Sequence, residues 1–161
     1  MTTKHDAVKK VNELISGIKI AMLMTEGHDG DFHSRPMMTQ EQDFDGDLWF
    51  FAERTSEKVA DIERNPLVNV VYVSDGKYIS IAGKADIISD VKKKKELWSE
   101  TMRVWFEAGP ESHDVVLLRV QSHSAQYWDS PSGLLGKAAS MVKVILTGDK
   151  DAAGESDKVR F

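Results

Sequence analysis

The chain contains no cysteine among its 161 residues. Disulfide bonds, thiolate metal ligands and cysteine nucleophiles are therefore excluded. A protein of this length can bury enough apolar surface to fold as one domain without such cross-links. The absence of cysteine also suits a reducing compartment, and we expect the protein to be cytoplasmic.

Long apolar runs and excess positive charge are missing as well. No stretch approaches the roughly 20 apolar residues needed to cross a bilayer. The start, MTTKHDAVKKVNEL, lacks the uninterrupted apolar segment of a signal peptide. Acidic residues outnumber basic ones by 26 to 21, which gives a net charge of −5. We therefore expect a soluble protein with neither nucleic acid nor membrane as a partner.

Motifs for metal binding and side-chain catalysis are incomplete. His28, Asp29, Asp31 and His33 could be imagined as metal ligands, but the Asp-Gly pair inside this segment is typical of a turn. The segment DFDGD at 43–47 lacks the ligand spacing of a calcium loop. No serine lies in a nucleophile elbow. We assign no metal site and no catalytic side chain.

Apolar spacing predicts the order of the elements. An amphipathic helix is expected between residues 3 and 18, a short helix at 56–65, a longer one from 90 to 106 and a closing one at 132–147. Strands are expected at 18–26, 32–40, 48–53, 67–74, 77–89 and 114–128. The lysine run near 92–95 is interpreted as solvated surface.

The pattern favours a mainly β fold over a Rossmann sheet, because strands and helices do not alternate regularly. We predict a small antiparallel barrel with N-terminal, connecting and C-terminal helices. Gly83, inside a long strand, indicates a bulge or a barrel bend. The domain is expected to span residues 1–148, and the polar segment 149–161 is expected to form a flexible tail unless it docks.

A possible anion site lies in LWFFAERTSEKVADIERNP at 48–66. Ser56 is a suitable N-cap, and the helix that it starts presents free N–H groups. Lys58 lies in the first turn, where a cation is unfavourable unless an anion compensates it. A capping serine and a surface lysine would also explain this segment. Arg35 favours the anion site, because a cation within a strand needs a partner and the adjacent Pro36 interrupts the ladder.

Six segments, in this order, carry a resemblance to a known family: HSRPM, the segment 48–66, VNVVY, YISIAGKADI, LWSETMRVWFEAGP and AQYWDSP. The chain resembles the FMN-binding split-barrel superfamily that includes pyridoxamine 5'-phosphate oxidase, and more closely its general-stress-protein-26-like branch. The resemblance implies a homodimer with non-covalent FMN at the subunit interface, and FAD is the alternative cofactor.

The resemblance also implies which residues border the flavin. Residues expected beside the ring and ribityl chain, with those of the next strand, are Ser34, Arg35, Pro36, Met37, Phe50, Phe51 and Ala52. Ser56 and Lys58 would hold the phosphate, with Arg35 assisting. Aromatic positions near the ring would be Tyr78, Trp105 and Trp128. Structural packing would explain these three aromatic residues equally well.

The sequence departs from authentic pyridoxamine phosphate oxidases at the substrate. After Asp90 their segment rich in arginine, serine and glutamine is replaced by KKKKELWSETMRVWFEAGP, and within YWDSPSGLLGK, from Tyr127 on, only Lys137 offers a cation. That activity is therefore not expected. We expect an FMN-dependent oxidoreductase that uses a reduced nicotinamide or a similar small-molecule donor. The alternatives are a stress protein that stores or senses flavin without turnover, and a haem-binding split barrel.

Overall fold

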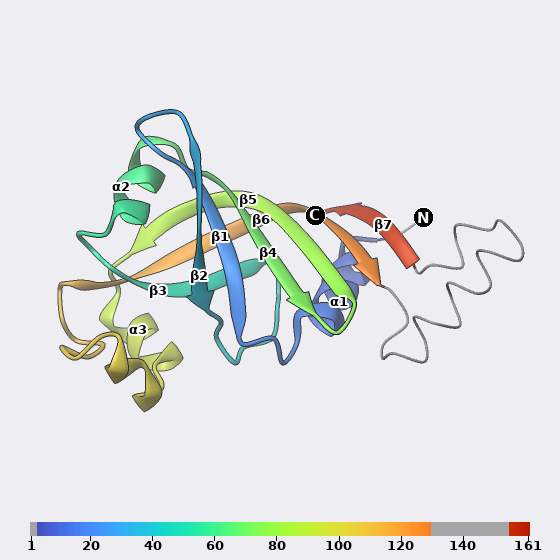
Figure 1. The fold of residues 1–161 in the computed structure, drawn as a ribbon. Coiled ribbons are helices and arrows are strands. Elements are labelled where there is room, and N and C mark those ends of the chain that lie inside the picture. Colours follow the sequence, from blue (N-terminus) through green and yellow to red (C-terminus); the bar gives the residue numbers. More distant parts are fainter. Residues whose placement is uncertain (1–2, 130–154) are drawn as a thin grey trace, which may run out of the picture.

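The computed structural model describes residues 3–129 and 155–161 (Figure 1). The helices are α1 (Lys4–Ile15), α2 (Glu57–Arg64), α3 (Val91–Leu97) and the short 3-10 helix η1 (Glu100–Val104). The strands are β1 (Ile20–Glu26), β2 (Phe32–Met38), β3 (Asp47–Glu53), β4 (Leu67–Ser74), β5 (Lys77–Ile88), β6 (Val115–Asp129) and β7 (Glu155–Arg160). No helix in these ranges is long and apolar enough to span a membrane.

All strand pairs are antiparallel and form one curled sheet in the order β2-β1-β4-β5-β6-β3, with β7 added beside β6. The edge strands β2 and β3 approach each other without a ladder, which leaves a split in the barrel wall. In Figure 1, α2 and α3 lie at one end of the sheet and α1 at the other. The predicted mainly β split barrel with N-terminal and connecting helices is confirmed. The predicted C-terminal helix lies outside the described residues.

Strand alternation builds the main core. In β4, Val68, Val70 and Tyr72 point inward and are buried, as their spacing predicts. Gly83 marks a register shift in the β5–β6 ladder, which confirms the predicted bulge. A Cβ there would lie 2.6 Å from the carbonyl oxygen of Gln121, so only glycine allows the strands to approach this closely.

The predicted helix from 90 to 106 is wrong in its middle. Asp90 caps α3 as expected, through a bond from the Lys93 N–H to its carboxylate. The helix then stops, and Trp98 adopts extended backbone with φ −70° and ψ 136°. Its indole packs edge-on against Phe51, with ring centroids 5.3 Å apart. This tertiary contact ends the helical pattern, because a continuous helix would carry the indole elsewhere.

Lys94 corrects the interpretation of the lysine run as solvated surface. Its side chain is only 1% exposed. Its ammonium group donates to the carbonyl oxygens of Ser112 and Val115, each at 2.8 Å. Burial, followed by repulsion from Arg54, lowers the pKa of Lys94. The two carbonyl acceptors compensate the loss of solvation, and Lys94 thereby fastens the loop before β6 to α3.

Residues 155–161 are docked, which is the alternative left open to a flexible tail. β7 pairs with β6 from Glu155 to Arg160, and Val159 is buried. Phe161 packs edge-on against Phe44 at a centroid distance of 5.6 Å. The apolar residues that end the chain fit the rim of the core. The segment is polar in composition, but these few contacts and a backbone ladder suffice to dock it.

Candidate functional site

The turn between β3 and α2 presents the start of a helix without a side-chain cap. Ser56 occupies the N-cap position, as predicted, with φ −71° and ψ 152°. Its hydroxyl does not cap the helix, however, because it donates to the carbonyl oxygen of Glu53 at 2.7 Å. The predicted capping bond is therefore wrong. N–H groups in the first turn of α2 are left without a side-chain acceptor, and the positive end of the helix dipole is open.

Arg35 reaches this region from the edge strand β2. It pairs in register with the buried Leu23, so its side chain points inward and is 20% exposed. One guanidinium nitrogen, Nη1, donates to the hydroxyl of Thr25 at 2.6 Å. The other, Nη2, lies 3.7 Å from Oδ2 of Asp61. These contacts fix the guanidinium beside α2.

Asp61 is a buried carboxylate that connects three elements. It is 2% exposed and lies on α2 between the buried Val59 and Ile62. Its Oδ2 accepts from the hydroxyl of Thr25 at 2.8 Å, while its Oδ1 accepts from Nη2 of Arg64 at 3.5 Å. A buried carboxylate requires such partners. Asp61 therefore positions Arg35 both directly and through Thr25.

Sequence reasoning missed Thr25 and Asp61. A signal for Thr25 exists, since it continues the inward-facing alternation of Ala21 and Leu23 in β1. A polar residue at the end of such an inward row needs a partner. The partner Asp61 is 36 residues away along the chain. Nothing in the sequence indicates that pairing.

Lys58 adds a second cation near Arg35. Burial lowers its pKa, repulsion from Arg35 lowers it further, and attraction to Glu53 acts in the opposite direction. Arg35 lies against Asp61, which is three residues after Lys58 on α2, so the two cations lie on the same side of the helix. Like charges held together beside a helix N-terminus favour the binding of an anion. The geometry thus brings Arg35, Ser56 and Lys58 to one place.

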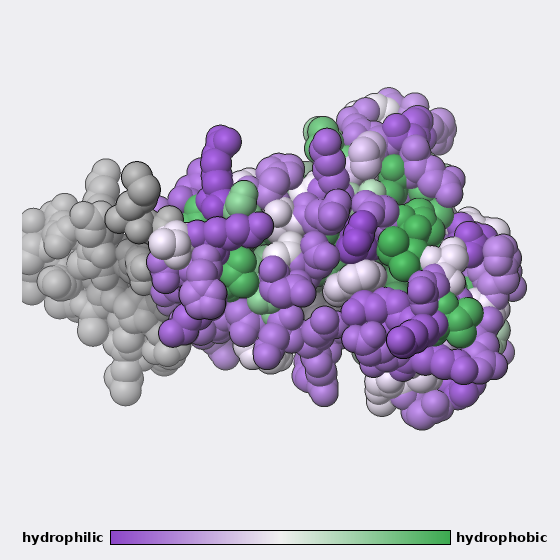
Figure 2. All heavy atoms as spheres, turned by 180° about the vertical axis from the view of Figure 1, so that it is seen from behind, coloured by the Kyte–Doolittle hydropathy of each residue, from purple (hydrophilic) through white to green (hydrophobic). Residues whose placement is uncertain are grey.

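An apolar hollow of about 120 Å³ adjoins Lys58. It is lined by Met37, Met38, Phe51, Lys58, Met102, Trp105 and Phe106. Trp105 is 63% exposed, which argues against a role in core packing. From behind, the largest areas of apolar surface lie toward the end that carries α2 and α3 (Figure 2). Part of a flat aromatic ligand could rest here while an anionic group lies on the cations.

Other predicted residues lie elsewhere. Phe50 and Ala52 are buried in the main core, so their side chains do not line the hollow. Four residues share the outward face of the sheet, as their register partners show: Ser34, Pro36, Tyr78 and Trp128. All four are exposed. The residues predicted to border the flavin therefore lie in three places: near the split between β2 and β3, on the outward face of the sheet, and in the main core.

The segment from His28 to His33 forms a turn with a local ion pair. The Asp29 carboxylate accepts from the N–H of Asp31 and lies 3.2 Å from Nε2 of His33. Its hydrogen bonds from Asp31 and His33 lower the pKa of Asp29, and the bond to Asp29 raises that of His33. Within the described ranges, no group of three or more histidine and carboxylate side chains could hold a metal ion.

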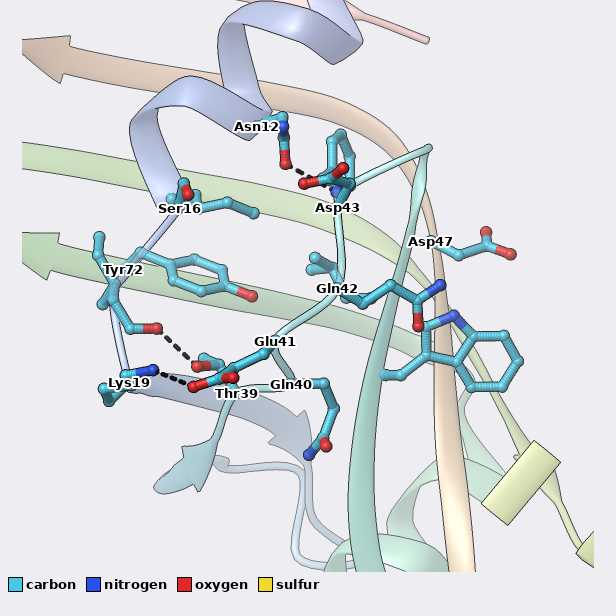
Figure 3. Close-up of a pocket in the computed structure, with 16 residues that line it drawn as sticks. Asn12, Ser16, Lys19, Thr39, Gln40, Glu41, Gln42, Asp43, Asp47 and Tyr72 are labelled. Atoms are coloured by element: carbon cyan, nitrogen blue, oxygen red, sulfur yellow. Dashed lines mark hydrogen bonds and ion pairs between the residues drawn. The ribbon is translucent and has the colours of Figure 1, made fainter. Parts of the chain in front are cut away.

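A larger cavity of about 420 Å³ lies beside the C-terminal end of α1 (Figure 3). It is lined by residues of α1, of the segment between β2 and β3, and of β3 and β4. None of the predicted flavin-site residues lines it. This cavity is therefore separate from the region of Arg35 and Lys58.

Known proteins resemble this chain in sequence and in fold. The sequence pattern of the family described as "Pyridoxamine 5'-phosphate oxidase like" matches residues 6–152. Protein bli-3 of Neurospora crassa is 26% identical over 155 residues, which cover 87% of this chain and 74% of that protein.

Two solved structures are similar in both fold and sequence. General stress protein 26 from Bacillus anthracis str. Sterne superimposes with a TM-score of 0.66 at 30% identity, covering 74% of this chain and 92% of that one. The general stress FMN/FAD binding protein from Xanthomonas citri gives a TM-score of 0.68 at 28% identity, covering 82% and 94%.

Replacing Asp61 by asparagine tests the buried network. We expect Asp61→Asn to lower the free energy of unfolding by about 1–3 kcal/mol, because Arg35 and Arg64 lose their charged acceptor. Urea denaturation followed by circular dichroism gives this value. Glu63→Gln, at an exposed position of the same helix, is the matched control and should stay within about 0.5 kcal/mol of the wild type. Equal urea midpoints for the two variants would show that the charge of Asp61 does not contribute to the stability of the fold.

Proposed function

The chain belongs to the pyridoxamine 5'-phosphate oxidase-like family, in its general-stress-protein-26-like branch, and from this premise we propose that it binds FMN with the phosphate between Arg35, Lys58 and the start of α2. The observation that carries the proposal is the placement of Arg35 beside α2, 3.7 Å from Asp61, with Lys58 in the first turn of that helix and no side-chain cap at Ser56. A phosphate monoester carries nearly two negative charges at neutral pH and compensates all three positive contributions.

The residues around the cations suit the rest of the flavin. Met37, Phe51 and Trp105 line the apolar hollow next to Lys58, where one side of the flat ring would find polarizable and aromatic contacts. FAD is a second candidate, because the relative from Xanthomonas citri is described as binding FMN or FAD. FMN is preferred here because its terminal phosphate carries the higher charge. When bound, the flavin would supply hydride or electron transfer.

We include a homodimer in the proposal. The outward face of β1, β4, β5 and β6 exposes Ile20, Met22, Val73, Tyr78 and Trp128. Five exposed large apolar side chains on one sheet face are typical of a protein interface. The exposed Ser34 and Pro36 lie on the same face, next to Arg35 in β2. A second copy packed on this face would enclose a flavin from the other side.

The proposed activity is that of a cytoplasmic FMN-dependent oxidoreductase that takes electrons from a small donor such as NADH or NADPH. A binder without turnover is the second candidate, favoured by the relative whose description gives FMN/FAD binding and no reaction. No described side chain near Lys58 is arranged as a general base. Chemistry would therefore come from the flavin, while the protein binds and orients it.

The phosphate site is tested by comparing FMN with riboflavin. We expect Arg35→Ala and Lys58→Ala each to weaken FMN binding by about 10- to 150-fold, because each removes a charge-assisted contact. Riboflavin, which lacks the phosphate, should bind both variants as it binds the wild type. Quenching of flavin fluorescence measures both affinities.

Lys9→Ala, at an exposed position of α1, is the matched control for loss of one positive charge and should bind FMN normally. If both site variants retain wild-type FMN affinity, the phosphate does not lie between these cations. Equal weakening of FMN and riboflavin would also contradict the assignment, because it would mean that the ring rather than the phosphate is affected.

The oxidoreductase role is tested by anaerobic reduction. We expect NADH or NADPH to bleach the absorbance of protein-bound FMN near 450 nm much faster than that of free FMN, because an enzyme orients the donor over the ring. Stopped-flow absorbance gives both rates. Bleaching no faster than that of free FMN would favour the binder without turnover.

The dimer is tested by placing charges on the outward face. We expect Met22→Asp and Val73→Asp to raise the dimer dissociation constant on the order of tenfold or more, because each buries a carboxylate at an apolar interface. Sedimentation equilibrium measures the constant. Val91→Asp changes an exposed apolar residue at the start of α3 and should leave it unchanged. A monomeric wild-type protein would refute the dimer.

A further inference from the structure

The cavity beside α1 is enclosed from three sides. The C-terminal turn of α1 contributes Asn12 and Ser16, and the segment between β2 and β3 contributes Thr39 to Phe44. Tyr72 of β4 and Trp49 of β3 complete the walls. Its volume of about 420 Å³ lies in the range of small-molecule sites, which are concave and partly apolar.

Tyr72 brings an unpaired polar group into this cavity. The side chain is only 3% exposed, and its burial raises the pKa of the phenol. Its hydroxyl has no hydrogen-bond partner among the residues that the structure describes. Figure 3 shows the ring extending from β4 with the hydroxyl pointing toward the segment that contains Gln42. Among the described residues the hydroxyl is not one of the fully buried unpaired polar atoms, so it is open to the cavity, and whatever fills the cavity, water or a ligand, supplies its partner.

The charges around the cavity are negative once internal pairs are counted. Lys19 and Glu41 neutralise each other through an ion pair of 2.6 Å. Asp43 forms no ion pair with any described residue, and its side chain lies near Asn12 at the end of α1 (Figure 3). That helix has no basic residue in its last turn, so its negative dipole end is uncompensated. Burial and the nearby Asp45 raise the pKa of Asp47, which also lines the cavity.

Together these features select a ligand class. A carboxylate and a helix C-terminus attract an ammonium group and repel an anion. The side chains of Trp49, Phe44 and Leu48 offer apolar contact to an aliphatic or aromatic body. The indole ring of Trp49 makes a cation–π contact with Lys93, whose Nζ lies 4.7 Å from the ring centroid. The Tyr72 hydroxyl can donate to an oxygen at the opposite end of the ligand.

We propose that this cavity is a second ligand site, which binds a small primary amine with its ammonium group on Asp43 and a hydroxyl or carbonyl oxygen on the hydroxyl of Tyr72. The site shares no lining residue with the hollow beside Lys58. Amine binding is therefore independent of FMN and of the function proposed above.

The proposal is tested with tyramine, which carries an ammonium group, an aromatic body and a terminal hydroxyl. Titration into the full chain, followed by ¹H–¹⁵N spectra, should show saturable shifts at the amides of Ser16, Asp43 and Tyr72. The neutral 4-ethylphenol and the anionic 3-(4-hydroxyphenyl)propionate should bind more weakly. Failure of tyramine to saturate these shifts, or equal binding of the anion, would overturn the proposal.

Two variants separate binding from folding. Tyr72→Phe should weaken tyramine by about 2- to 12-fold without lowering the thermal midpoint, because the hydroxyl loses no described protein partner. Asp43→Asn should weaken it by about fivefold, since the carboxylate is partly solvated. Asp31→Asn, at an exposed turn away from the cavity, is the control for loss of one carboxylate and should bind as the wild type does.

Wild-type affinity in both Tyr72→Phe and Asp43→Asn would overturn the assignment of the ammonium and oxygen contacts. Arg35→Ala distinguishes this site from the proposed flavin site. It should bind tyramine normally whether or not it binds FMN. A loss of tyramine binding in Arg35→Ala would contradict the independence of the two sites and with it the proposal.

Discussion

The buried carboxylate of Asp61 is the constraint on which the candidate anion site depends. A negative charge inside the protein requires hydrogen-bond donors and positive partners. Thr25, Arg35 and Arg64 meet that requirement from three different elements. Because Arg35 lies on an edge strand, its long side chain could otherwise extend into solvent. The network turns it inward and holds it next to the first turn of α2.

The same network leaves a local excess of positive charge. Asp61 is shared between Arg35 and Arg64, so it only partly compensates either guanidinium. Lys58 and the start of α2 add to the excess, and among the described residues no side chain caps this helix start. A folded chain normally avoids such repulsion unless a ligand relieves it. An anion bound as proposed would therefore stabilise this end of the barrel.

The places where sequence reasoning failed have a common cause. Lys94 belongs to a run of four lysines, and only the loop before β6 decides that this one is buried. Trp98 follows a good helical pattern, but its contact with Phe51 ends the helix. Ser56 stands where a cap is expected, yet its hydroxyl donates a hydrogen bond to the carbonyl oxygen of Glu53. For Lys94 and Trp98 a contact with a distant segment outweighs a weak local preference, and for Ser56 the competing acceptor lies three residues earlier in the chain.

The sequence by itself determined the order of the elements, the curled antiparallel sheet, the bulge at Gly83 and the pairing of a basic strand residue with a basic helix start. These follow from apolar periodicity and backbone stereochemistry, which act over a few residues. Only the tertiary structure decided that Asp61 and Thr25 hold Arg35, that Phe50 and Ala52 are core residues, and that Tyr72 faces a cavity where no described residue pairs with its hydroxyl. Burial and partner choice depend on segments distant in the chain, and no local pattern records which of them meet.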